Sequence, residues 1–101
     1  RVICAFQPHT YTRTKELFDD FVQVLKLADK VILAEIYAAR ETDTLGISSR
    51  DLAAQIPGAE YCATLEDVTQ RLSQLAQPGD LILTVGAGDI YLAGEALLKQ
   101  G

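Results

Sequence analysis

The chain has 101 residues, of which 49% are hydrophobic and 23% charged, a composition typical of one folded domain and unlike a disordered tail. Nine Lys and Arg residues against fourteen Asp and Glu residues give a formal net charge of −5, which disfavours binding to nucleic acid or to an anionic membrane surface. The apolar runs are far shorter than the roughly 20 residues of a membrane-spanning helix, so no membrane partner is expected either.

Short apolar segments alternate with amphipathic ones along the first half of the chain. Residues 2–6 form an unbroken apolar run, typical of a strand buried on both faces. Apolar residues then recur at helical spacing over 17–28, between charged residues that supply a solvent-facing side, and this pattern predicts a helix. A second apolar run over 31–36, interrupted only by Glu35, predicts the next strand, and a polar link follows at 37–47.

The second half repeats this alternation. Ser48 with Asp51 forms a capping-box pattern, which predicts a helix ending near residue 56. The remaining predicted elements are a short strand at 59–63, a helix after the cap pattern of Thr64 with Asp67, a strand at 81–85 and a closing helix at 90–100. This order favours an α/β fold, a single three-layer, Rossmann-like domain over 1–101 with a mainly parallel sheet and helices on both faces. The strand order does not follow from the pattern.

The two cysteines lie inside apolar, strand-like segments. Cys4 and Cys62 lack the CxxC spacing of a redox or zinc site. Two buried thiols in a reducing compartment are favoured over a disulfide, so we expect a cytoplasmic protein.

The link after the first strand carries the chain's one histidine. In a parallel sheet the carboxyl ends of all strands meet at one edge, where ligands bind. Pro8 ends the first strand, His9 follows at once, and Thr12 or Thr14 can cap the next helix, with Arg13 in its first turn. A guanidinium beside a helix N-terminus suits a carboxylate or a phosphate.

Two interpretations of this link stay open. In the first, His9 and Arg13 bind an anionic ligand. In the second, His9 bonds a backbone carbonyl, and Arg13 pairs with Glu16 or Asp20 at the surface. Spacing alone does not separate them.

The second strand and the link after it carry further charges near the same edge. Glu35 lies near the end of an otherwise apolar strand, and we expect it to pair with a neighbouring cation or hydroxyl. The segment 37–41, Tyr-Ala-Ala-Arg-Glu, is either a mobile loop that meets another domain or a solvated charged loop.

A glycine pair follows the last predicted strand. Gly86, Ala87 and Gly88 resemble the start of the dinucleotide fingerprint G-x-G-x-x-G, but Tyr91 stands where the third glycine would be. We expect a turn that lets the backbone approach a ligand closely, or simply a tight strand-to-helix corner, with Asp89 as the helix N-cap.

The sequence holds no complete catalytic set. It lacks a GxxxxGK[ST] phosphate loop, a G-x-S-x-G elbow, an HExxH motif, a second histidine and the acidic cluster of a phospho-receiver domain. An edge rich in ligand-type residues without a nucleophile, base or metal cluster is expected of part of an active site that other domains complete.

Four segments together carry a family resemblance: FQPHTYTRT (6–14), EIYAARE (35–41), ISSRDLA (47–53) and TVGAGDIY (84–91). They resemble the carboxyl-terminal domain of the Mur ligases, in the branch that adds L-alanine. The first segment is the most specific, because sister ligases that add later residues carry other residues there.

The resemblance implies an ATP-dependent, Mg²⁺-requiring ligase that joins L-alanine to UDP-N-acetylmuramate in peptidoglycan precursor synthesis. ATP and Mg²⁺ would be bound mainly by a central domain, and this domain would close over the site formed with the amino-terminal and central domains. It assigns substrate binding to His9, Thr10 and Arg13 and to the glycine turn Gly86-Ala87-Gly88, and no catalytic residue or metal ligand to this chain. The isolated chain is then expected to be inactive. A sister Mur ligase or a stand-alone, flavodoxin-like module for a small anion remains an alternative.

The sequence departs from the family at two points. Many members have arginine where this chain has Thr10, so Arg13 would carry more of the anchoring. A further strand and helix with a DDYGHHP-like motif is absent, and we expect a domain without its first strand–helix unit. Because that loss would expose part of the sheet, self-association is expected too.

Overall fold

The computed structural model describes residues 1–86 and 90–100. Most element boundaries agree with the sequence-based ranges to within one or two residues, the exceptions being discussed below. In chain order the elements are β1 (Val2–Gln7), α1 (Tyr11–Glu16), α2 (Phe18–Leu25), β2 (Lys30–Ala34), α3 (Ser49–Gln55), β3 (Glu60–Cys62), α4 (Leu65–Leu75), β4 (Leu81–Gly86) and α5 (Tyr91–Gln100).

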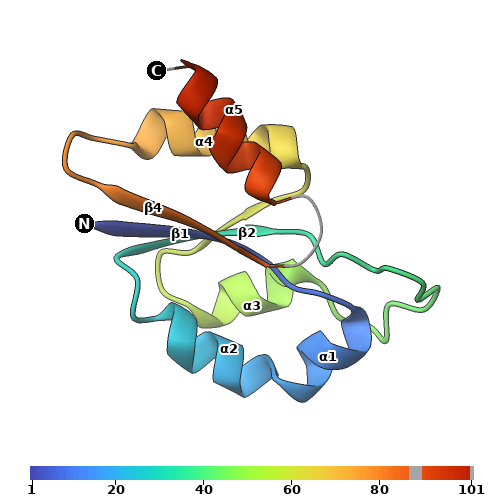
Figure 1. The fold of residues 1–101 in the computed structure, drawn as a ribbon. Helices are drawn as coiled ribbons and strands as arrows, with labels where there is room; N and C mark the ends of the chain where they lie inside the picture. The colour runs from blue at the N-terminus through green and yellow to red at the C-terminus, as the bar shows by residue number, and fades with distance from the viewer. Residues whose placement is uncertain (87–89, 101) are drawn as a thin grey trace.

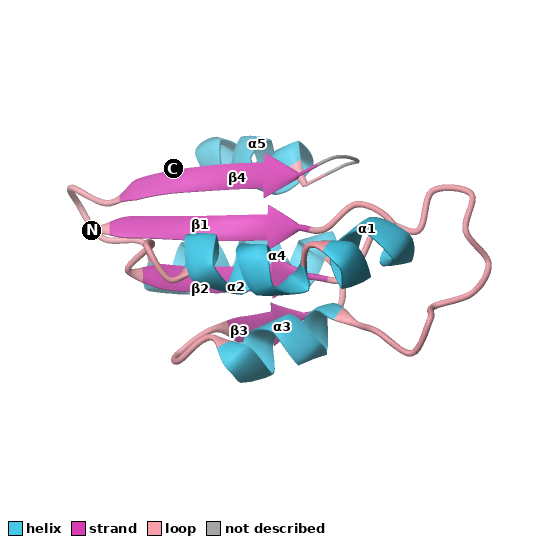
Figure 2. Cartoon of the chain, turned by 90° about the horizontal axis from the view of Figure 1, so that it is seen from below, coloured by secondary structure: helices cyan, strands magenta, loops and turns pink. Residues whose placement is uncertain are grey.

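The strands form one parallel sheet in the order β3-β2-β1-β4. Helices α1, α2 and α3 lie on one side of the sheet, and α4 and α5 lie on the other (Figure 1). The predicted three-layer α/β fold with helices on both faces is therefore confirmed. All strands point the same way (Figure 2), so the links that follow them meet at one edge, which we call the carboxyl edge.

The alternation of side chains along β1 divides the core into two layers. Ile3 and Ala5 pack toward α4 and α5, and Cys4 and Phe6 pack toward α2 and α3. Burying an apolar side chain of this size contributes roughly 1.5–3 kcal/mol, so β1 is a main source of stability. Cys62 lies in the layer opposite Cys4, and both thiols are free and buried, as predicted, with pKa values raised by burial.

The predicted helix over 17–28 starts earlier and is divided in two. Leu17, with φ −103° and ψ 14°, ends α1 and begins α2. These dihedrals interrupt the helical ladder, although the Leu17 N–H still donates to Arg13 O at 3.0 Å. The second strand likewise ends at Ala34 and not at residue 36, because the Glu35 carboxylate accepts the Ile36 N–H at 2.9 Å. The spacing of apolar residues in the sequence indicates neither the break at Leu17 nor the early end of β2.

Strand β4 lies at one edge of the sheet and is incompletely covered on its α2 side. Leu81, Leu83 and Val85 are each 41–55% exposed, and a groove between β4 and α2 continues this surface to Val24 and Leu27. An uncovered edge strand with an exposed apolar surface promotes association between copies of a chain, and this surface is where such contact would be expected. Self-association of the chain stays a prediction.

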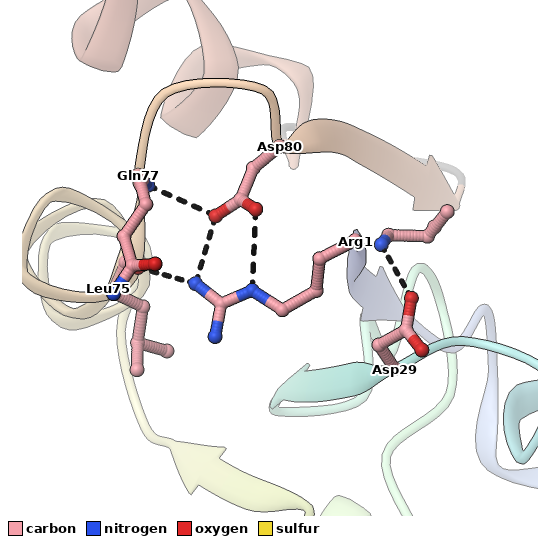
Figure 3. Close-up of polar contacts among 6 residues, drawn as sticks. Arg1, Asp29, Leu75, Gln77 and Asp80 are labelled. Carbon is pink, nitrogen blue, oxygen red and sulfur yellow. Dashed lines mark hydrogen bonds and ion pairs between the residues drawn. The ribbon is translucent and has the colours of Figure 1, made fainter.

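An ion pair joins the start of β1 to the turn before β4, at the end of the sheet opposite the carboxyl edge (Figure 3). The Arg1 guanidinium donates to both oxygens of Asp80, at 3.2 and 2.8 Å, and to Leu75 O at 2.8 Å. The Gln77 N–H donates to the same carboxylate at 2.9 Å. These bonds raise the pKa of Arg1 and lower that of Asp80, and they hold the α4–β4 turn against β1.

The ion pairs of Glu60 with Arg71 and Lys30 make the stability of the fold depend on pH. Glu60 accepts from Arg71 Nε at 2.7 Å and lies 2.8 Å from Lys30 Nζ, which lowers its pKa from 4.5 to about 2. A carboxyl group whose pKa falls on folding stabilises the protein above pH 4.5, and that contribution is lost as the pH drops toward 2. We expect urea unfolding to show Glu60→Gln destabilised relative to the parent chain at pH 6 and nearly equal to it near pH 2. A constant difference across this range would contradict the assignment.

Among residues 1–86 and 90–100, the helices are all too short or too polar to cross a membrane.

Candidate functional site

The ends of β1, β2 and β4 come together at the carboxyl edge. His9, after β1, forms an isolated parallel bridge with Tyr37, after β2. Gln7 at the end of β1 pairs with Gly86 at the end of β4. The links after β1 and β2 are therefore neighbours, and β1 ends beside Gly86, the last residue of β4.

His9 is exposed and is fixed through its backbone neighbours. The Tyr37 N–H donates to Pro8 O, and the Thr10 N–H donates to Tyr37 O, both at 2.8 Å. The rings of His9 and Tyr37 are stacked, with centroids 5.9 Å apart and planes at 16°. The His9 side chain thus has a defined direction at the edge of the sheet.

Thr10 is the N-cap of α1, and the expectation that Thr12 or Thr14 would cap this helix is wrong. Its Oγ1 accepts the Arg13 N–H at 3.2 Å. Thr14 is instead buried, and its hydroxyl donates to Thr10 O at 2.6 Å. Thr10 has φ 61° and ψ 149°, a conformation that β-branched residues avoid, and only the surrounding bonds can hold it there.

Arg13 is the third residue of α1 and is exposed. It forms no ion pair with Glu16 or Asp20 in the structure. The ion pair that the second interpretation of this link expected for Arg13 is therefore not formed. The guanidinium is available to an anion that approaches the start of α1.

The N–H groups at the start of α1 already have a partner, the Glu41 carboxylate. Glu41 Oε1 accepts from Tyr11 N at 2.5 Å and from Thr12 N at 3.2 Å, and Oε2 accepts from the Thr12 hydroxyl. The hydroxyl bond, with help from the two N–H groups and the charge of His9, holds the pKa of Glu41 below its ordinary value despite partial desolvation. Glu41 is therefore ionised at neutral pH, and an external anion would meet the side chains of His9 and Arg13 instead of these N–H groups.

Glu35 joins both ends of the 37–47 loop. Its carboxylate accepts from the hydroxyls of Ser48 at 2.9 Å and Tyr61 at 2.7 Å, and from the N–H groups of Ile36 at 2.9 Å and Ser49 at 3.0 Å. Burial alone would raise its pKa, but these four bonds outweigh burial and lower it. The expected hydroxyl partner is confirmed. The predicted cap at Ser48 and Asp51 is confirmed as well, and it fixes where α3 begins.

Gly86 is required by the packing of the sheet. Its φ is 140°, and a Cβ atom at this position would lie 2.3 Å from Gln7 O. Gly86 thus lies close to the backbone of β1, and an approach of the glycine turn to a ligand stays a prediction. Ala87, Gly88 and Asp89, also named from the sequence, lie outside the described residues.

Within the described parts of the chain, no three His, Cys, Asp or Glu side chains are grouped as a metal site would need. One buried polar atom at the carboxyl edge, Gln7 Oε1, has no hydrogen-bond partner among those residues. The Gln7 amide nitrogen donates to Glu35 O at 3.2 Å.

Comparison with known proteins places this arrangement in a family. Residues 1–88 match the sequence model described as Mur ligase, glutamate ligase domain. The chain is 57% identical to the UDP-N-acetylmuramate–L-alanine ligase of Lachnospira eligens, over 98% of the chain and 22% of that protein. The protein of the same name from Acetivibrio thermocellus is 50% identical, over 99% of the chain and 22% of that protein. The one from Clostridium botulinum strain Eklund 17B is 48% identical, over 100% of the chain and 23% of that protein.

The chain thus spans about 22% of the length of these curated relatives. The family model covers most of the described fold, from β1 to the end of β4. On these matches, the chain belongs to the Mur ligase family.

Proposed function

We propose that the chain is the carboxyl-terminal domain of an ATP-dependent UDP-N-acetylmuramate–L-alanine ligase of the cytoplasm. The observation that carries the proposal is the near-complete coverage of the chain by relatives of that name at 46–57% identity. The exposed His9 and Arg13 at the carboxyl edge support it, because an amino-acid substrate presents a carboxylate to be bound.

In the proposed reaction, ATP supplies the phosphoryl group that activates the muramoyl carboxylate, with Mg²⁺ held by other parts of the polypeptide. The residues of this chain would bind and orient the amino acid. The Arg13 guanidinium pairs with the carboxylate of L-alanine, while His9 and the Thr10 hydroxyl line the approach to it. Holding the amine near the activated carbonyl and excluding water favours amide formation over hydrolysis.

The test is an assay of the longer polypeptide that contains this chain. Phosphate release should require ATP, Mg²⁺, UDP-N-acetylmuramate and L-alanine together. Replacing L-alanine with L- or D-glutamate tests the sister-ligase alternative, because the matching family is described as a glutamate ligase domain. Turnover with glutamate and not with alanine would overturn the proposed substrate.

A second measurement addresses the stand-alone alternative. Isothermal titration of the 101-residue chain with L-alanine, ATP and inorganic phosphate should show weak binding or none, because the proposal places most of the site in other domains. Tight binding of one small anion by the isolated chain would favour an independent binding module.

A further inference from the structure

The contact between Glu41 and α1 joins segments that are thirty residues apart in the chain. One carboxylate accepts three hydrogen bonds, all from the first two residues of α1. A carboxylate at a helix N-terminus is favourable both as an acceptor and through the helix dipole. The contact therefore fixes where α1 begins.

A second attachment lies four residues earlier. Tyr37 exchanges two backbone hydrogen bonds with Pro8 and Thr10, and a turn closed by Glu41 N and Ala38 O, 3.0 Å apart, then brings the carboxylate back to α1. Ala39 has φ 56° inside this turn. The segment 37–41 is thus bonded to the β1–α1 link through Tyr37 and to the start of α1 through Glu41.

The strained residue lies between the two attachments. Thr10 has its N–H bonded to Tyr37, and the next two residues are bonded to Glu41. A threonine with φ 61° is strained, and its backbone would relax toward an ordinary conformation if one attachment were lost. Relaxation at Thr10 would rotate the start of α1 and with it Arg13, which is three residues further along.

We propose that Glu41 is a positioning residue, which holds the first turn of α1 so that Arg13 faces the anionic group of the substrate. The inference rests on the proposed function, since the substrate carboxylate is the ligand that Arg13 would meet. Glu41 does not touch the ligand in this arrangement. It acts through α1.

The first experiment is a double-mutant cycle in the full-length ligase. Glu41→Ala should raise KM for L-alanine about 10-fold and leave KM for ATP unchanged, because a small displacement of a binding group is enough for such a loss. In an Arg13→Ala background, the same change should cost less than about 2-fold, since Glu41 acts through Arg13. Losses that simply multiply, or that fall equally on both substrates, would overturn the inference.

A matched pair of milder variants guards against misfolding. Glu41→Gln keeps one acceptor oxygen and should raise KM for L-alanine less than Glu41→Ala does. Asp43→Asn removes the same charge from the same loop, but within the described residues the Asp43 side chain accepts a hydrogen bond from Leu45 N alone, so the change should leave KM unchanged. Equal effects of the two amide variants would assign the result to loop charge and overturn the positioning role.

Amide hydrogen exchange separates this inference from the proposed function. In the 101-residue chain, Glu41→Gln and Glu41→Ala should speed exchange at Tyr11 and Thr12 by about 10-fold or more and leave the strand amides of β1 unchanged. Should the unmodified ligase fail to use L-alanine, the proposed function falls, and the exchange result still decides whether Glu41 anchors α1. Unchanged exchange at these two residues would overturn the anchoring itself.

Discussion

Under the proposed function, Arg13→Ala should lower kcat/KM for L-alanine by about 100-fold in the longer polypeptide, equivalent to about 2.7 kcal/mol of lost charged hydrogen bonding. The expectation follows from the free, exposed position of this guanidinium at the start of α1. The nearby N–H groups of Tyr11 and Thr12 cannot replace it, because they already donate to Glu41. Steady-state kinetics with L-alanine as the varied substrate measures the change.

Two variants show whether the lost interaction is specific. Arg13→Lys keeps the charge but loses the planar fork that binds both oxygens of a carboxylate, so an intermediate loss is expected. Lys15→Ala removes a cation from the same helix, two residues further on and exposed, and should leave kcat/KM within about 2-fold. Unchanged kinetics in Arg13→Ala would remove this residue from the site.

The layers of the fold follow from the sequence because they depend on local pattern. Apolar runs such as 2–6 and 31–36 and the caps at Ser48 and Thr64 each act within a few residues. The break at Leu17 and the early end of β2 were not predicted, because hydrogen bonds and backbone dihedrals decide them and not hydrophobic spacing.

The candidate site was predicted only in part, for a similar reason. His9 and Arg13 stand out by residue type and by their place after a strand. Glu41 does not, since its partners lie about thirty residues earlier, and a carboxylate in a charged loop is more often solvated. The cap of α1 was assigned to the wrong threonine, because Thr10, Thr12 and Thr14 are alike in sequence and only the backbone turn at Thr10 distinguishes them. At Gly86 the glycine pattern suggested contact with a ligand, whereas the contact that requires glycine is with the backbone of Gln7, which the pattern does not indicate.

The second large effect concerns the stability of the loop that carries Glu41. Glu35→Leu should lower the free energy of unfolding of the chain by about 2–3 kcal/mol in urea. The change leaves the hydroxyls of Ser48 and Tyr61 and the N–H groups of Ile36 and Ser49 without their acceptor, in a region that is partly buried. These donors lie just after β2, at the start of α3 and on β3, so the loss reaches beyond the loop.

Graded variants can apportion this effect. Tyr61→Phe removes a single hydrogen bond and should cost about 1 kcal/mol, and Glu35→Gln, which keeps one acceptor oxygen, should fall between Tyr61→Phe and Glu35→Leu. Glu95→Ala removes an exposed carboxylate from α5 and should stay within about 0.5 kcal/mol of the parent chain. A Glu35→Leu chain as stable as the Glu95→Ala control would mean that water satisfies the four donors, and that Glu35 does not hold the ends of the loop together.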